Sequence, residues 1–405
     1  MKVLHINQLD VIGGAAIAAL RLHEGLSLAG CTSHLLVGEA SVQNDAIIEI
    51  KRHRLLRKIN YRLSQKLGIS SITITNTFDI AKHPLYQAAD VINFHNLHGG
   101  YFNYLALPFL TKSKPAVLTV HDMWNFTGHC ASSHDCDRWQ IGCGKCPYPQ
   151  IYPPIGLDNT KLEWRLKNWV YHHADLQFIY PSRWVMARAK SSMLKDLPMH
   201  HIPHGIDTTK YQPLDKAKCR YLLDIPLDKK VIMFAAEDVS NPHKGGAFLC
   251  EALANLPDAL KAELLLVALG KGGDVIAAKA GIPVVNLGYI SHDRIKAAAF
   301  SAADLFVFPT LAEIFGLVLQ ESMACGTPIV AFDVGGVGDL VRHNVTGYLA
   351  KLKDTNDLCN GIIELLSDDH KRNKLALNCR HIVCEEYSLK LQAERYIKVY
   401  QSIIG

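Results

Sequence analysis

The stretch Thr310-Leu-Ala-Glu313-Ile-Phe315-Gly316-Leu317-Val-Leu-Gln-Glu321 decides how we interpret this chain. It follows a short apolar run, Asp304-Leu-Phe-Val-Phe-Pro309, which is typical of a strand buried on both faces of a parallel sheet. The residues from Leu317 to Cys325 predict a helix, and a glycine and a proline then end it. Glu313 therefore falls in a loop at the carboxyl end of a strand, where open α/β sheets bind ligands.

Two further residues of this stretch suggest chemistry. Gly316 opens the predicted helix and would let an anion approach the free N–H groups of its first turn. Glu321 lies a little over two helical turns after Glu313, so both carboxylates can face one site. The alternative is that Glu313 only complements the helix dipole and Glu321 pairs with a surface lysine.

The pattern Glu-x-Phe-Gly-x-x-x-x-Glu, followed by Gly326-Thr-Pro-Ile-Val330, resembles the Glu-x7-Glu motif of family 4 (group 1) retaining glycosyltransferases. Bacterial exopolysaccharide and colanic-acid-type glycosyltransferases are the members it resembles. The resemblance implies the GT-B fold, in which two Rossmann-like α/β lobes face each other across a cleft and the C-terminal helix returns to the first lobe. It also implies metal-independent, anomer-retaining transfer of a sugar, with a nucleotide-diphosphate sugar as donor. The acceptor would be a saccharide or a lipid-linked saccharide in polysaccharide biosynthesis.

Length and composition agree with a soluble two-domain enzyme. A chain of 405 residues is too long for one ordinary core, and 49% hydrophobic with 20% charged residues is normal for globular α/β proteins. No apolar run approaches the ~20 residues of a membrane span, and the start predicts a strand instead of a signal peptide. We therefore expect a cytoplasmic protein with reduced thiols. The net charge of +5 is too small to indicate a nucleic-acid partner.

The predicted domains are 1–205 on the acceptor side, 206–387 for the nucleotide sugar, and a helix at 388–405 that crosses back. The boundary rests on the run His201-Ile-Pro-His204-Gly205-Ile-Asp207, which resembles the family's crossover Ile-Pro-Asn-Gly-Ile-Asp. Here His204 replaces the asparagine. Residues 125–155 form a Cys-rich loop that is too long for a plain connection.

The first domain offers two candidate positions. Gly13 and Gly14 follow the predicted strand Lys2–Asn7 and open a helix, either as a phosphate-binding turn or as a simple tight turn. The spacing is not Gly-x-Gly-x-x-Gly, which disfavours a nicotinamide dinucleotide. His121 follows the strand 115–120, either as a structural histidine or, as the resemblance implies, as a contact of the donor sugar. His95 and His98 point to the same rim and rank lower.

The second domain supplies most of the donor site that the resemblance implies. Lys244 would hold the diphosphate, Glu313 the donor sugar and Glu321 the ribose, while the backbone at Tyr289 and Ile290 would meet the base. The complete predicted set is catalytic His121, Glu313 and Lys244, with donor contacts at Gly13, Gly14, Lys244, Tyr289, Ile290, Glu313, Phe315, Gly316, Leu317 and Glu321. The family's phosphate-binding arginine is missing, because Ala235-Ala236-Glu237 stands at its place.

Other functions stay open at this point. A sugar-nucleotide epimerase or phosphorylase uses the same fold, and a catalytically silent scaffold would explain the missing arginine. Asp135-Cys-Asp137 resembles the metal-binding Asp-x-Asp of another glycosyltransferase architecture, but it lies in the cysteine loop and not after a nucleotide-binding strand. We expect no cofactor for catalysis.

A basic segment at 51–67 has two interpretations. It carries seven basic and no acidic residues up to Lys66, and Leu55, Leu56, Ile59, Leu63 and Leu67 recur at helical spacing. Such a helix can lie on an anionic membrane, which would place the protein peripherally on the inner face. Alternatively, its apolar side packs on the first domain and its charges are solvated.

Four of the eleven cysteines gather within the loop, at Cys130, Cys136, Cys143 and Cys146. The two-residue gap of Cys143-Gly-Lys-Cys146 is that of a zinc knuckle, so the spacing predicts a structural tetrahedral zinc site. Free buried thiols or a redox disulfide are the alternatives.

Overall fold

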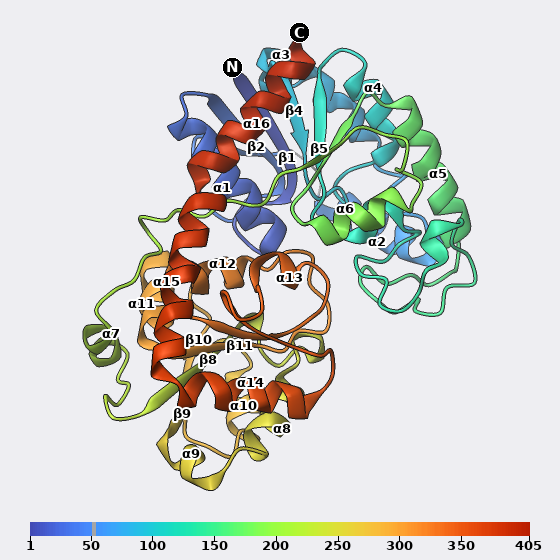
Figure 1. The fold of residues 1–405 in the computed structure, drawn as a ribbon. Helices are drawn as coiled ribbons and strands as arrows, with labels where there is room; N and C mark the ends of the chain where they lie inside the picture. Colours follow the sequence, from blue (N-terminus) through green and yellow to red (C-terminus); the bar gives the residue numbers. More distant parts are fainter. Residues whose placement is uncertain (51–53) are drawn as a thin grey trace. The chain divides into compact units, whose positions relative to one another are not determined.

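The computed structural model describes residues 1–50 and 54–405 and divides the chain into two units (Figure 1). Unit 1 comprises Met1–Gly205 together with Leu389–Gly405, and unit 2 comprises Ile206–Ser388. Each unit is built on one parallel β-sheet with helices between its strands. The prediction of two Rossmann-like α/β domains is thereby confirmed.

The sheet of unit 1 has the strand order β3-β2-β1-β4-β5-β6-β7, with every neighbouring pair parallel. Its strands are β1 (Lys2–Leu9), β2 (Thr32–Glu39), β3 (Ile47–Glu49), β4 (Val91–Phe94), β5 (Ala116–Thr119), β6 (Gln177–Tyr180) and β7 (Met199–His201). Every residue of β4 and of β5 is buried, as expected for central strands covered on both faces. The segments that follow β4 and β5 therefore emerge side by side at one edge of the sheet.

Seven α-helices accompany this sheet among the described residues: α1 (Gly14–Leu28), α2 (Arg54–Leu67), α3 (Pro84–Ala88), α4 (Leu107–Thr111), α5 (Thr160–His173), α6 (Arg183–Lys190) and α16 (Leu389–Ile404). The C-terminal α16 packs against α1 and adds Tyr396 and Tyr400 to the core of unit 1. A Cβ at Gly25 of α1 would lie 3.1 Å from the carbonyl oxygen of Leu389, so the two helices approach closely there. Among the helices of the described residues, none is both long and apolar enough to cross a membrane.

The sheet of unit 2 has the order β10-β9-β8-β11-β12-β13, again with parallel neighbours. Its strands are β8 (Lys230–Asp238), β9 (Leu264–Lys271), β10 (Val284–Gly288), β11 (Leu305–Phe308), β12 (Ile329–Phe332) and β13 (Gly347–Ala350). Its described helices are α7 (Lys216–Leu222), α8 (Gly246–Ala254), α9 (Asp258–Glu263), α10 (Gly273–Ala277), α11 (Asp293–Ala302), α12 (Leu317–Ala324), α13 (Val337–Leu340), α14 (Thr355–Ser367) and α15 (Asp369–Glu386). The connection from β11 to α12 carries the Glu313 stretch.

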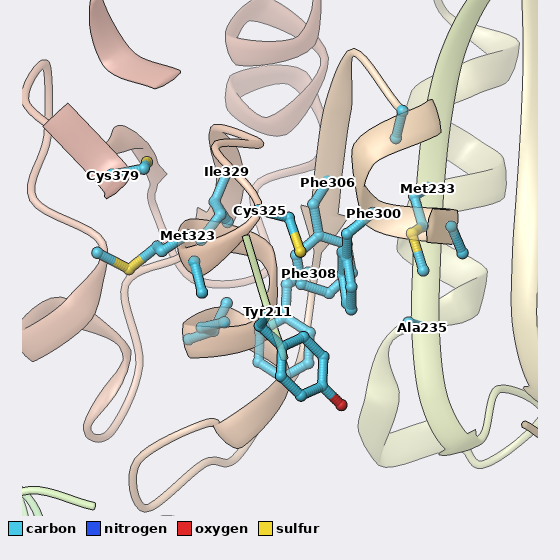
Figure 2. Packing of buried hydrophobic residues seen from close by; sticks show 14 of the residues in the cluster. Tyr211, Met233, Ala235, Phe300, Phe306, Phe308, Met323, Cys325, Ile329 and Cys379 are labelled. Carbon is cyan, nitrogen blue, oxygen red and sulfur yellow. The ribbon is translucent and has the colours of Figure 1, made fainter. Parts of the chain in front are cut away.

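An aromatic cluster in the core of unit 2 supports the start of that connection (Figure 2). Phe306 of β11 packs edge-on against Phe300 of α11, with ring centroids 5.4 Å apart, and lies 5.7 Å from Phe308. Cys325 and Tyr211 belong to the same buried cluster. Because close-packed cores resist displacement, the end of β11 is a firm base for the loop that follows it.

Candidate active site

Lys244 and Glu313 come together at the carboxyl edge of the unit 2 sheet. Lys244 ends a short 3-10 helix after β8, Glu313 follows β11, and these two strands are neighbours. The Lys244 Nζ lies 3.3 Å from Glu313 Oε2, and the side chains are 30% and 20% exposed. The ion pair is therefore partly accessible to a ligand. The backbone N–H of Leu311 also donates to the carbonyl oxygen of His243 at 2.9 Å, which ties the two loops together.

Two glycines allow this close approach. A Cβ at Gly245 would lie 1.8 Å from the carbonyl oxygen of Pro309, and one at Gly335 would lie 1.9 Å from that of Glu313. The N–H of Gly336 donates to the same Glu313 carbonyl oxygen at 2.9 Å. The glycine-rich turn at 333–338 thus packs against the backbone of Glu313, and only residues without a side chain fit there.

The N-terminus of α12 lies against the same carboxylate. Gly316 caps the helix with a left-handed backbone (φ 95°), and a Cβ built on it would lie 3.6 Å from the Glu313 Cγ. Phe315 is buried against Tyr387, at a ring distance of 6.2 Å, and Leu317 packs partly buried on the same core. The N–H groups of a first helical turn have no partner within the helix. A cation, a carboxylate and the N-terminus of a helix therefore meet within one small region.

The structure places the other predicted donor residues of unit 2 in different environments. Glu321 is only 3% exposed and lies 3.8 Å from Lys296 Nζ, a residue that the sequence did not single out. Tyr289 is 46% exposed, and Lys271 Nζ stands 5.3 Å from the centre of its ring. Ile290 packs partly buried against the core. Lys271 ends β9 and pairs with Asp238, which directly follows the Ala236-Glu237 segment where the arginine is missing.

His121 belongs to unit 1, where it ends a chain of three histidines whose rings are joined by hydrogen-bond contacts. His5 of β1 contacts His95 (Nδ1 to Nε2, 2.9 Å), and His95 contacts His121 (Nδ1 to Nε2, 2.9 Å). His204 stacks on His121 with ring centroids 5.3 Å apart and planes inclined by 15°. His121 is the half-buried member, whereas the other three are buried. His5 could not be predicted as part of this chain, because a histidine within an apolar strand looks like any core residue.

Burial keeps this histidine chain neutral. It lowers the pKa of His121 to about 4 despite the nearby Asp122 carboxylate, and burial together with His23 lowers the pKa of His5 to about 3. Burial also places the pKa of His95 well below its usual range. His121 can therefore donate or accept a hydrogen bond near pH 7 without carrying a charge.

A histidine–carboxylate pair, His98 and Asp122, lies beside these histidines. The Nε2 of His98 lies 2.7 Å from Asp122 Oδ2, and the His98 ring lies 5.5 Å from that of Trp124. Burial raises the pKa of Asp122, but the contacts with His98 and the N–H of Trp124 outweigh it and leave the pKa below the usual value. The carboxylate is thus ionised and orients His98.

Gly13 and Gly14 also lie in unit 1, at the start of α1. Gly13 has a left-handed backbone (φ 87°), and no atom lies within 4 Å of a Cβ built on either glycine. Their surroundings are open, so a close internal contact does not explain the glycines. The open turn at a helix N-terminus fits an approaching ligand.

The predicted zinc site is not assembled. The four loop cysteines are free thiols, and no group of three or more His, Cys, Asp or Glu within residues 1–50 and 54–405 is placed to hold a metal ion. Instead the thiols have separate partners: Cys143 Sγ accepts from the N–H of Gly128 at 3.2 Å, and Cys146 Sγ lies 3.2 Å from His129 Nε2. Burial raises the pKa of Cys130 to about 12 and that of Cys143 to about 11.

Two family models match the chain in succession. The model described as "Glycosyltransferase Family 4" matches residues 12–210, and "Glycosyl transferases group 1" matches residues 217–381. WcaC of Escherichia coli (strain K12), which is named as a glycosyl transferase of colanic acid biosynthesis, is 28% identical over 82% of this chain and 83% of its own.

Solved structures with similar folds include sucrose-phosphate synthase from Thermosynechococcus elongatus, with a TM-score of 0.73 at 19% identity over 99% of both chains. Anabaena HepE in complex with UDP-glucose gives a TM-score of 0.71 at 19% identity, covering 99% of this chain and 100% of that one.

Proposed function

Because the chain belongs to the group 1, family 4 glycosyltransferases, we propose that it moves a sugar from a nucleotide-diphosphate donor to a saccharide or lipid-linked saccharide acceptor in polysaccharide biosynthesis. The observation that carries the proposal is the meeting of Lys244, Glu313 and the N-terminus of α12 at one sheet edge. The relative named for colanic acid biosynthesis supports the polysaccharide assignment. The solved complex of HepE with UDP-glucose supports a nucleotide-sugar donor.

The proposed donor site uses fixed charges of unit 2. Lys244 and the N–H groups at Phe315, Gly316 and Leu317 bind the diphosphate, whose negative charge grows as the sugar departs. Preorganised cations and helix N-termini stabilise such charge without a metal ion. Glu313 then faces the donor sugar. Glu321 binds the ribose, held from behind by Lys296.

The remaining contacts complete the proposed donor and acceptor roles. Tyr289 and Ile290 meet the base of the nucleotide. In unit 1, His121 hydrogen-bonds the transferred sugar, and the open Gly13-Gly14 turn contacts the donor diphosphate or the acceptor. We further propose that the anomeric configuration is retained, as the Glu-x7-Glu pattern suggests.

The test is incubation of the full chain with a panel of UDP-, GDP-, ADP- and TDP-hexoses, with and without acceptor saccharides. We expect release of nucleotide diphosphate that an acceptor accelerates and that EDTA leaves unchanged. The anomeric coupling in the product's proton NMR spectrum reports retention. An isomerised donor without nucleotide release would indicate an epimerase. Absence of both turnover and nucleotide-sugar binding would indicate a silent scaffold.

We also propose that α2 docks the enzyme on anionic membrane. The first basic residues of the segment, Lys51 and Arg52, lie outside the described residues. Within α2, Ile59, Leu63 and Leu67 follow each other at four-residue spacing and are 50%, 38% and 39% exposed. Exposed apolar side chains among basic residues favour a membrane surface over packing on the domain.

Sedimentation with vesicles tests the membrane proposal. We expect binding to phosphatidylglycerol vesicles, weaker binding at high salt, and none to phosphatidylcholine. Leu63→Glu should abolish binding, whereas Leu377→Glu is the matched control, since Leu377 is 74% exposed on α15 of unit 2. Equal and salt-insensitive failure to bind both vesicles would refute the proposal.

A further inference from the structure

A cavity of about 160 Å³ lies within unit 1, apart from the histidine chain. Five segments form its wall: Gln8 at the end of β1, Ser64 and Gln65 of α2, residues 69–71, residues 98–100 after β4, and residues 152–155 of the cysteine loop. Its volume is about half of the ~300 Å³ at which pockets for drug-sized ligands begin. The cavity is therefore better suited to a ligand with one small ring than to a ligand with several linked rings.

The wall is neutral and rich in hydrogen-bonding groups. Serine hydroxyls and glutamine amides line it, and no Lys, Arg, Asp or Glu stands among its described residues. Tyr152, 53% exposed, adds an aromatic ring. A phosphate, carboxylate or ammonium group would lose its hydration here without gaining a counter-charge. A polyhydroxylated ring would find hydroxyl and amide partners, and its C–H face would find the tyrosine.

One buried polar atom of the wall lacks a partner. His98 is 3% exposed, and its Nδ1 makes no hydrogen bond. Asp122 Oδ2 lies 2.7 Å from Nε2 on the other side of the ring, so Nδ1 is the ring nitrogen that stays without a partner. A buried polar atom without a partner is costly, and a shift of the ring toward the cavity would give it a ligand hydroxyl as partner. The rings of Trp124 and Tyr152, each 5.5 Å away, fix the orientation of His98.

We propose that this cavity binds one neutral sugar ring of the acceptor, with His98 Nδ1 hydrogen-bonding a ring hydroxyl and Tyr152 covering a C–H face. The inference rests on the proposed transferase function, because it assigns the ring to the acceptor. Ser64 and Gln65 line the cavity from α2, whose exposed residues are proposed to meet the membrane. A lipid-linked acceptor would then enter from the side of this helix.

The test needs no donor sugar. Saturation-transfer NMR on the full chain would compare neutral glucose, galactose and fucose with glucuronate and glucose 6-phosphate. We expect signals from at least one neutral sugar and none from the charged ones. Tyr152→Ala and His98→Phe should each weaken binding tenfold or more. Tyr221→Ala is the control, because Tyr221 is 90% exposed on α7 of unit 2.

Each result bears on one proposal. Absence of neutral-sugar binding, a preference for charged sugars, or binding that survives both cavity variants would overturn the assignment. In transfer assays, Tyr152→Ala should raise the acceptor KM at least tenfold and leave donor hydrolysis in water unchanged. If neutral sugars bind but no nucleotide sugar is turned over, the transferase proposal fails while the sugar site stands. If the donor is hydrolysed but no neutral sugar binds, the cavity assignment alone fails.

Discussion

Among single residues, Lys244 should cost the most activity when it is removed. Lys244→Ala should lower kcat/KM for nucleotide-sugar turnover roughly a hundredfold or more, since a fixed cation acts mainly on charge that develops in the transition state. Lys261→Ala is the matched control, because Lys261 forms a similar 3.2 Å ion pair with Asp258 in the same unit. Full turnover by both Lys244→Ala and Glu321→Ala, in proteins that fold normally, would show that the donor site is misassigned.

The histidine chain makes a second residue-scale prediction, concerning tautomers. A neutral imidazole carries one N–H, and two contacts join His5, His95 and His121 through Nδ1 and Nε2 in the same sense. Both contacts are hydrogen bonds only if all three rings adopt the same tautomer. We expect Nδ1–H, because the alternative buries an N–H at His5 Nε2, which has no partner. Orphaned N–H groups are rare in protein interiors.

Long-range proton–nitrogen correlation spectra of histidine-labelled protein at pH 7 test this expectation. Three Nδ1–H rings would leave His121 with a neutral N–H donor at the half-buried end of the chain. The variant His5→Phe should release the constraint and mix the tautomers of the other two rings. A mixture of tautomers in the unaltered protein would contradict the coupling.

At the scale of elements, the sequence predicted strands and helices correctly where the composition of a segment alone determines its burial. The run 305–308 is entirely apolar and forms the buried strand β11, and the predicted helix after Gly316 is α12. The three-residue β3 was missed, because Ile47–Glu49 is too short for periodicity to be seen. The packing of the glycine-rich turn at 333–338 could not be predicted either, since it depends on the distant Glu313 backbone.

The two ends of α12 offer a prediction with an internal control. Gly316 and Gly326 both have left-handed backbones, with φ 95° and 73°. Alanine at either position should destabilise unit 2 by about 1–2 kcal/mol through backbone strain. At Gly316 the new Cβ would also lie 2.6 Å from Leu319 and face the Glu313 side, whereas at Gly326 it meets only ordinary contacts. Calorimetry should show both losses, but only Gly316→Ala should weaken nucleotide-sugar binding. Equal binding by both variants would argue against a donor at this helix end.

For the whole molecule, the sequence predicted two α/β domains, but it could not predict which side chains would meet. Lys296 and Lys271 were overlooked because a lysine on a helix or at a strand end is usually solvated. The cysteine spacing suggested one metal site, yet the fold gives the thiols separate partners. In each case the outcome depends on contacts between segments far apart in sequence, which local patterns do not encode.

The buried histidines should also make the stability of unit 1 depend on pH. Burial lowers the pKa of His23 to about 4, of His5 to about 3 and of His121 to about 4. In the unfolded chain these groups titrate near 6.5. Between the folded-state pKa values and 6.5, the unfolded state binds more protons than the folded state. The free energy of unfolding therefore falls as the pH falls from about 6.5. The slope approaches about 1.4 kcal/mol per pH unit for each histidine.

Tryptophan fluorescence isolates this effect, because all five tryptophans (Trp124, Trp139, Trp164, Trp169 and Trp184) lie in unit 1. The midpoint of unfolding in guanidinium should drop steadily from pH 6.5 to pH 5. Aspartates whose pKa is lowered in the folded protein do not contribute in this range, because their stabilisation is lost only as the pH falls below about 5. His23→Leu removes one titrating group and should reduce the slope by about 1.4 kcal/mol per pH unit. A midpoint that stays constant over this range would mean that the histidines are protonated in the folded protein, and the neutral chain around His121 would then be wrong.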